Sequence, residues 1–412
     1  MGTKSVTWDE DTFTNSDTDW DLLSQISVSP VILDASPVTA SRKLFWYQMQ
    51  SPLNSMGIQR IKIILSVLVT FITLLLTVRV RSDGSRVMIQ TVQHKTTHVG
   101  TFDRIVASYR DTGFESRPDR KDERWLIQLA NVSQTPNHES ELPFFFHVPR
   151  CGGGTIQHIL GKCYGLTLAN DLGSDRKSRN IPILPSVEVF RSEDGIPFVN
   201  VDTYTAEGIL DSKLKGLVES RISNVIMSPH LHPAARLFND DTHGRCFTLL
   251  RHPMERAVSM FHYLAIAHWD PAYDPSLAYI SLDMYARSKR AEHNWMVRFL
   301  SNELEHDLND THLEMAKTIL HDKCLVGLLS RIEESFHRFE KYFGWSGTPL
   351  SQEQADCRNQ LLHFRWPNRH SYPPVEEGSV VWDLLHKENT YDIMLYEYAV
   401  NLFDEQESLL NR

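Results

Sequence analysis

The sequence predicts an α/β domain with a central parallel sheet in three layers, preceded by a single transmembrane helix. Two segments predict the domain, at residues 143–163 and 245–264. In each, a short apolar run typical of a buried strand is followed by a polar loop and then by apolar residues at helical spacing. A third observation predicts the membrane helix, because residues 63–78 contain no charged residue.

The composition places the chain among ordinary globular proteins. Hydrophobic residues make up 41% of its 412 residues, and charged residues make up 23%. The formal net charge of -10 argues against binding to nucleic acid through a basic overall field, so we expect no nucleic-acid partner. A local basic cleft for an anionic ligand remains compatible with this charge.

The apolar run at residues 63–78 is too short by itself to span a bilayer. Its sixteen residues would form a helix of about 24 Å, whereas the hydrocarbon core is about 30 Å thick. Adding Ile61 and Val80, with Lys62 and Arg79 reaching toward the interfaces, closes the gap. We therefore expect a signal-anchor helix over residues 61–80, the alternative being a buried core helix.

The segments on either side of this run indicate a type II topology. Residues 1–60 are polar and acidic and are expected to form a disordered cytosolic tail, while residues 81–141 are expected to form a lumenal stem. Two glycosylation sequons, at Asn131 and Asn309, both follow the run. The remaining residues, 142–412, are expected to form a folded lumenal domain.

The first of the two strand-to-helix joints, in residues 143–163, combines a strand with a glycine loop. The apolar residues 143–148 predict a buried strand, the next residues read Pro-Arg-Cys-Gly-Gly-Gly-Thr, and a helix pattern follows up to Gly165. Glycines allow backbone N–H groups to approach an anion, and a helix start adds free donors and partial positive charge. The alternative is a glycine-rich turn without a ligand. The triphosphatase pattern GxxxxGK[ST] is absent from the loop.

The second joint has the same organisation. Residues 245–250 predict a strand, and Pro253 is a suitable first residue for the helix that follows. Arg251 at the strand end and Ser259 on the helix suit a phosphate dianion, with a surface ion pair as the alternative role for Arg251. If the two strands are parallel, both loops meet at one crevice, which suits a ligand with two separated anionic groups.

These two segments resemble the donor-binding motifs of Golgi carbohydrate sulfotransferases, especially the heparan sulfate 2-O and 6-O type. Phe145 to Leu160 resembles the 5′-phosphosulfate loop, Thr248 to Tyr263 resembles the 3′-phosphate motif, and the tail from Asn389 to Gln406 resembles the closing helix. The resemblance implies a P-loop-like fold and transfer of a sulfuryl group from 3′-phosphoadenosine 5′-phosphosulfate (PAPS) to a carbohydrate hydroxyl. The product would be 3′-phosphoadenosine 5′-phosphate (PAP), and no metal is expected.

The resemblance also implies roles for individual residues. Arg150 stands where the family usually has a lysine on the leaving oxygen, and Cys151 stands in place of the more usual threonine. His230, with His232 as the second choice, matches the family's catalytic base, and a carboxylate base is the other candidate. The residues expected to hold the donor are Arg150, Cys151, Gly152, Gly153, Gly154, Thr155, Arg251 and Ser259.

Several readings stay open at this stage. The expected partners are a polysaccharide or glycoprotein glycan and, through one helix, the Golgi membrane, with the catalytic domain in the lumen. The departures at Arg150 and Cys151 leave room for a carbohydrate- or PAP-binding pseudoenzyme, and a kinase-like phosphotransferase using ATP is a further alternative. Of the five cysteines, Cys324 and Cys357 are expected to pair, since neither lies in a motif.

Overall fold

The computed structural model describes residues 126–171, 186–270, 272–345, 351–363, 372 and 374–411. The chain divides into two compact units, residues 1–93 and 94–412, and every described residue belongs to the second unit. The expected cytosolic tail and transmembrane helix therefore lie outside the described residues. Among the residues that are described, no helix is both long and apolar enough to span a bilayer.

A mixed seven-stranded sheet forms the centre of the described domain, in the order β3-β4-β2-β5-β1-β6-β7. Six strands run parallel, and β3 pairs antiparallel with β4 at one edge. The two strands that the sequence predicts, β1 and β6, are parallel neighbours. The strands are β1 (Glu141–Phe146), β2 (Leu168–Ala169), β3 (Val189–Arg191), β4 (Pro197–Val199), β5 (Val225–Ser228), β6 (His243–Leu250) and β7 (Cys324–Leu328).

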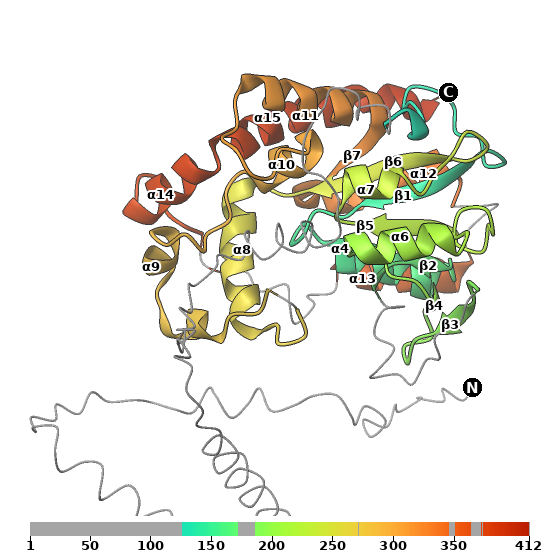
Figure 1. Cartoon of the computed structure of the whole chain (residues 1–412), viewed down its shortest axis with the longest axis horizontal. Coiled ribbons are helices and arrows are strands. Elements are labelled where there is room, and N and C mark those ends of the chain that lie inside the picture. The colour runs from blue at the N-terminus through green and yellow to red at the C-terminus, as the bar shows by residue number, and fades with distance from the viewer. Residues whose placement is uncertain are drawn as a thin grey trace, which may run out of the picture. The chain divides into compact units, whose positions relative to one another are not determined.

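Helices connect these strands and cover both faces of the sheet. Figure 1 shows α11 and α15 lying side by side, and α8 standing to one side of the sheet. The α-helices are α4 (Gly153–His158), α6 (Ala206–Leu214), α7 (Leu231–Ala235), α8 (Pro253–Ile266), α9 (Leu282–Ala286), α10 (Trp295–Ser301), α11 (Asp310–Lys323), α12 (Ile332–Phe343), α13 (Gln352–His363), α14 (Val380–Glu388) and α15 (Thr390–Glu405). A π-helical turn (Ile159–Cys163) extends α4, and 3-10 turns occupy Pro275–Tyr279, Leu329–Arg331 and Gln406–Asn411.

Alternate residues of the central strand build two separate cores. Phe144 and Phe146 face a core shared with α7, α10, α11 and α15. Phe145 faces the opposite core, shared with α4 and α12. Because successive side chains of a strand point to opposite faces, a run of three phenylalanines can supply both cores. The three-layer α/β architecture expected from the sequence is confirmed for the described domain.

The folded domain begins earlier than the expected boundary at residue 142. Leu129 forms a parallel bridge with Gly244 and is 1% exposed, so the last part of the expected stem packs on the sheet. Arg245 stabilises this region, because its buried guanidinium forms an ion pair with Glu141 and donates to the Tyr342 hydroxyl at 3.0 Å. The sequence gives no local signal for this segment, because its apolar residues show no helical or strand periodicity.

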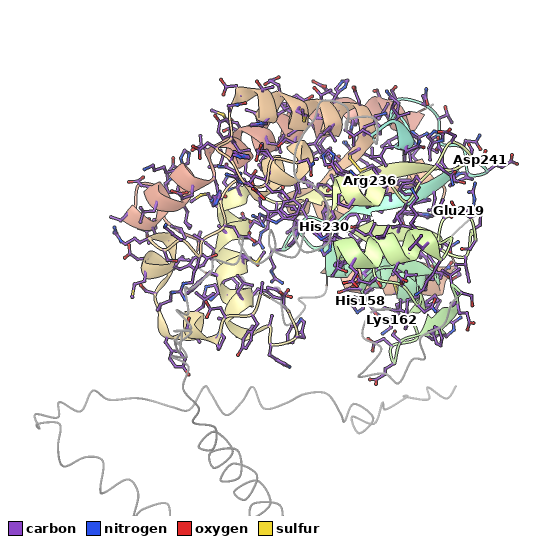
Figure 2. The ribbon with its side chains drawn as sticks, viewed as in Figure 1. His158, Lys162, Glu219, His230, Arg236 and Asp241 are labelled. Atoms are coloured by element: carbon purple, nitrogen blue, oxygen red, sulfur yellow. A yellow bond between two sulfur atoms is a disulfide. The ribbon has the colours of Figure 1, made fainter. Side chains whose placement is uncertain are left out.

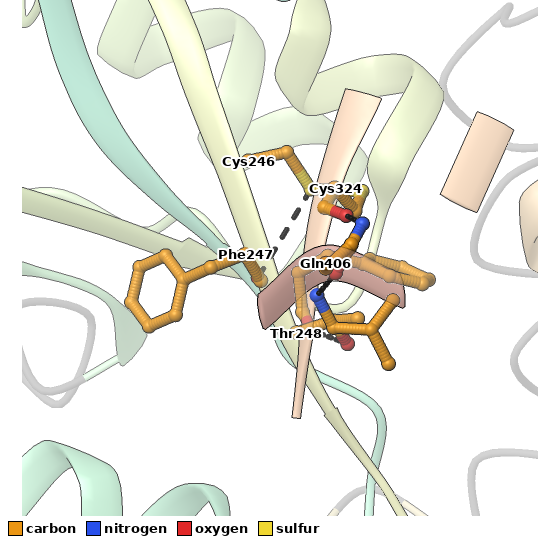
Figure 3. Close-up of a disulfide and its surroundings, with 7 residues drawn as sticks. Cys246, Phe247, Thr248, Cys324 and Gln406 are labelled. Atoms are coloured by element: carbon orange, nitrogen blue, oxygen red, sulfur yellow. Dashed lines mark hydrogen bonds between the residues drawn. A yellow bond between two sulfur atoms is a disulfide. The ribbon is translucent and has the colours of Figure 1, made fainter. Parts of the chain in front are cut away.

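Two disulfides cross-link the domain, and neither is the expected Cys324–Cys357 pair. Cys246 is bonded to Cys324, its register partner on β7, with 4.6 Å between the Cα atoms. Figure 3 shows this bond beside Gln406, whose amide joins the Val326 N–H and the Cys324 carbonyl. Cys163 is bonded to Cys357 on α13. Spacing alone could not reveal these pairs, because both depend on which elements become neighbours in the sheet and its covering layer.

Candidate active site

The two predicted joints meet at a topological switch point of the sheet. β1 and β6 are adjacent, but the chain leaves β1 toward β2 on one side and leaves β6 toward β7 on the other. In open α/β sheets the crevice at such a point, beyond the carboxyl ends of the strands, is the usual ligand-binding place. The structure therefore brings together the glycine loop and the start of α8, as the sequence predicts.

The glycine loop presents a row of unused backbone donors. Gly152 caps α4 with φ +92° and ψ 15°, a left-handed conformation that favours glycine. Within the described part of the chain, the N–H groups of Gly152, Gly153 and Gly154 donate to no protein acceptor, although Thr155 N–H donates to the Gly152 carbonyl at 3.1 Å. Free amides at the start of a helix form a site for an anion.

Arg150 lies at the mouth of this loop and points toward α8. Its backbone has φ +65°, which is uncommon for a residue other than glycine. Its Nε donates to the Ser259 Oγ at 3.1 Å, and its guanidinium lies 4.5 Å from the centre of the Tyr263 ring. Within the described residues Arg150 forms no ion pair, and burial lowers the pKa of its guanidinium. A partly buried cation without a carboxylate favours binding of an anion.

Arg251 approaches the same point from the end of β6. Its Nη1 donates to the carbonyl oxygen of Arg150 at 3.4 Å, and its Nε pairs with Glu255 at 3.0 Å. The ion pair corresponds to the alternative role that the sequence left open, yet Glu255 is 63% exposed, so this pair is weak and easily exchanged. The two arginines thus concentrate positive charge beside the free amides.

Cys151 is placed differently from the expected donor contacts. Its side chain is 1% exposed, and it belongs to the core that contains Phe146 and Trp295. Burial raises the pKa of the thiol to about 12, so the sulfur stays protonated. Cys151 therefore faces away from the crevice, and any contribution that it makes to anion binding comes from its backbone.

The two candidate base histidines flank the start of α7 and face different surroundings. His230 follows β5, is 6% exposed, and its Nε2 lies 2.8 Å from the backbone oxygen of Tyr204. In Figure 2, His230 lies on the side of the sheet near α8, whereas Arg236 at the other end of α7 lies away from it. His232 instead contacts the Leu300 carbonyl on α10 at 2.8 Å. These positions favour His230 over His232 as the residue nearer the crevice.

His147 and Tyr204, which belong to no motif of the sequence, lie beside the glycine loop in the structure. His147 directly follows β1, and its Nδ1 lies 2.7 Å from the Tyr204 hydroxyl. The ring also occupies the space above Gly153, where an added Cβ would lie 2.1 Å from Nε2. The signal that could have identified His147 is its position as the first polar residue after the strand.

No candidate metal site is found among the residues that the structure describes. No group of three or more His, Cys, Asp or Glu residues there has the arrangement needed to hold a metal ion. The charges that face the crevice are those of arginine side chains and backbone amides, which suit an anion directly.

Comparisons with known proteins leave the family open. No protein-family model matches the chain, and no curated protein matches it in sequence. Among solved structures, mouse sulfotransferase SULT7A1 complexed with PAP is 12% identical, with an alignment that covers 70% of this chain and 92% of that chain at a TM-score of 0.30. A likeness at this level is too weak to support a function.

Proposed function

We propose that this protein is a membrane-anchored sulfotransferase that moves a sulfuryl group from PAPS to a hydroxyl of a polysaccharide or glycan in the Golgi lumen. The observation that supports it best is the convergence of two unlike anion-binding elements at one crevice. The free amides of Gly152, Gly153 and Gly154 form one element. Arg251, just after β6, and Ser259, on α8, form the other. PAPS carries two separated anionic groups that would need both.

Each residue has a distinct task in this proposal. The glycine amides and Thr155 hold the 5′ end of the donor, while Arg251 and Ser259 hold the 3′-phosphate. Arg150 lies between the two elements through its contacts with Ser259 and Arg251. It is therefore suited to stabilise the charge that develops on the leaving oxygen, where a preorganised cation in a site with little water is most effective.

An exposed aromatic side chain supports a carbohydrate acceptor. Trp269 is 61% exposed although it lies beside the site, with its ring centre 6.4 Å from that of Tyr263. Tyr263 in turn covers the Arg150 guanidinium, and its hydroxyl donates to Asp270 at 2.8 Å, which fixes the start of the loop after α8. A flat indole face next to a polar centre suits the apolar face of a sugar ring.

The disulfides support a lumenal location for the domain. Four of the five cysteines are paired, and such bonds persist mainly in oxidising compartments. We propose the type II topology predicted from residues 61–80, with the domain in the Golgi lumen. Protease treatment of sealed microsomes should remove the tail and spare the domain, and digestion of the domain in intact vesicles would contradict this topology.

Thermal shift with PAP, ADP and ATP tests the donor site. PAP should raise the melting temperature more than either other nucleotide, because a ligand that binds only the folded state stabilises it. Arg251→Ala should weaken PAP binding about 10- to 100-fold, since hydrogen bonds to charged groups contribute about 1.5–3 kcal/mol. The control is Arg287→Ala, which removes an arginine whose side chain is 54% exposed in a surface pair with Asp283.

Transfer of radiolabelled sulfate from PAPS to a panel of polysaccharides then tests the reaction. Labelled product with the wild-type protein supports a sulfotransferase. PAP binding without transfer to any acceptor would support a pseudoenzyme instead, and a preference for ATP and ADP would support a phosphotransferase.

A further inference from the structure

His147 extends β1 by one residue, and its ring lies against Gly153 of the glycine loop. Its backbone N–H donates to the Ser228 carbonyl at 2.9 Å, so the position of its Cα is fixed by the sheet. The strand ends where the glycine loop begins, so the ring lies above the loop.

Gly153 shows how closely the ring approaches the loop. A Cβ added at Gly153 would lie 2.1 Å from Nε2 and 2.2 Å from Cδ2 of His147, far inside van der Waals contact. At the neighbouring Gly154 an added Cβ would meet nothing within 4 Å. The absence of a side chain at position 153 therefore makes room for the imidazole, and Nε2 is the ring atom that faces the donor loop.

Tyr204 holds the other side of the imidazole. Its hydroxyl lies 2.7 Å from the His147 Nδ1, and its own N–H donates to the Asp202 carboxylate at 2.7 Å. The carbonyl of Tyr204 accepts from the His230 Nε2 at 2.8 Å. Because a carbonyl oxygen only accepts, the His230 Nε2 carries a proton and is not a base in this arrangement. When the His147 Nδ1 donates to the tyrosine hydroxyl, the His147 Nε2 keeps its lone pair.

We propose that His147 is the general base of the transfer and that Tyr204 is the residue that positions it, an inference that rests on the proposed function. The acceptor hydroxyl oxygen forms a bond to sulfur while the bond from sulfur to the bridging oxygen of PAPS breaks. The hydroxyl proton passes to the His147 Nε2, PAP leaves with the bonding electrons, and the histidine later releases its proton to solvent. His230 then supports the site by fixing the backbone of Tyr204.

The charges around His147 agree with this role. Burial, and to a smaller extent the positive charge of Arg150, lowers the pKa of His147 to about 4. The imidazole is therefore neutral and able to accept a proton throughout the mildly acidic range. Negative charge that gathers on the departing PAP during transfer favours the imidazolium that forms beside it.

The first test compares single variants under PAPS transfer to the polysaccharide that the wild type sulfates fastest. His147→Ala should lower kcat about 100- to 10,000-fold, the usual contribution of a general base, while PAP affinity stays within about threefold. Added imidazole should restore part of the activity, a response that a purely structural histidine would not give. His147→Gln serves as the second variant if His147→Ala does not fold. The control is His337→Ala, a histidine 74% exposed on α12.

A double variant tests the role of Gly153. Gly153→Ala should reduce kcat because its new Cβ displaces the imidazole of His147. In the His147→Ala background it should cause no further loss, because that imidazole is absent. Tyr204→Phe should reduce kcat and shift the acid limb of the pH–rate profile while the protein still binds PAP.

The outcomes separate the two proposals. A wild type that transfers no sulfate contradicts the proposed function, and the inference fails with it. An active wild type with an active His147→Ala variant overturns the inference alone. The base is His230 if two results are found together: His230→Asn abolishes transfer and recovers activity with imidazole, and His147→Ala stays active.

Discussion

At the scale of single residues, Arg150 offers the sharpest test of the proposed chemistry. Its guanidinium contacts Ser259 and Tyr263 and forms no ion pair within the described residues. Arg150→Ala should lower kcat about 100- to 1,000-fold, the usual effect of losing one preorganised donor at a developing charge, and should weaken PAP binding far less. Arg150→Lys should keep measurable activity. Steady-state kinetics with PAPS, beside calorimetry with PAP, measure both quantities.

Two results would contradict this assignment. A fully active Arg150→Ala variant would show that the charge is not needed in the transition state. An inactive wild type that Arg150→Lys activates would instead identify a protein that retains the donor site without turnover.

Buried histidines give the protein a predictable response to acid. Burial lowers the pKa of His147 and of His230 to about 4, below the ordinary value of 6.5. As the pH falls below about 6.5, the unfolded chain binds two protons that the folded protein does not, so both groups destabilise the fold. Burial raises the pKa of Asp392 to about 6, so below this pH the folded protein binds one proton that the unfolded chain does not. This group therefore stabilises the fold on acidification. The balance of these three groups is a loss of stability on acidification.

Urea unfolding at pH 7.0, 6.0 and 5.0 checks this response. With a net difference of one proton, these groups should reduce the free energy of unfolding by about 1.4 kcal/mol per pH unit between pH 6 and 5. A free energy that is constant or rises over this interval would contradict the assigned protonation states.

Among the residues of the proposed site, those named from the sequence belong to a local pattern. Arg150, the three glycines, Arg251 and Ser259 each stand at a fixed offset from a strand end, and the structure brings them together. His147 carries no local signal, because its proposed role depends on Tyr204, which is 57 residues away in the chain. Cys151 lies within the loop pattern, but only the packing of the core shows that its side chain turns inward.

At the scale of elements, the helix ends depend on contacts that no local signal reports. α10 begins at Trp295, and the carboxylate of Asp392 on α15 accepts from the N–H groups of Met296 at 3.0 Å and Val297 at 2.8 Å. The chain separation of these contacts is 96 and 95 residues. Asp392 therefore caps a helix in another part of the sequence.

Asp392→Ala should destabilise the domain by about 2–5 kcal/mol, because it leaves two buried N–H groups without an acceptor. Denaturant unfolding measures the loss, and Asn401→Ala, an exposed position on the same helix, is the control. Equal stability of the two variants would show that the cap contributes nothing.

The elements that the sequence predicted are those with strong local patterns. β1, β6 and α8 were identified from an apolar run or from apolar residues at helical spacing, with a starting residue such as Pro253 for α8, and α15 was identified from its resemblance to the family's closing helix. β2 has two residues and β3 and β4 have three each, too few for any periodicity. The order of the strands follows from their packing in three dimensions and has no signature in spacing.

At the scale of the whole domain, the two disulfides connect distant parts of the chain. The Cys163–Cys357 bond fixes α13 against the turn that ends the first helix. Cys357→Ser should lower the free energy of unfolding by about 2–5 kcal/mol. Thiol titration of the denatured, unreduced wild type should find a single free thiol, that of Cys151. Three or more free thiols would show that at least one of the bonds is not formed.

The long span of the Cys163–Cys357 bond also sets an order of events during biosynthesis. At about 5–20 residues per second, roughly 10–40 s separate the synthesis of Cys163 from that of its partner, which lies 194 residues later. Cys151 is already synthesised when that interval begins, and Cys246 and Cys324 are added during it, so in an oxidising compartment each of the three can form a temporary bond with Cys163 before Cys357 exists. If the domain folds in the lumen, as we propose, any such bond has to be resolved by thiol–disulfide exchange before the side chain of Cys151 can take its buried place in the core.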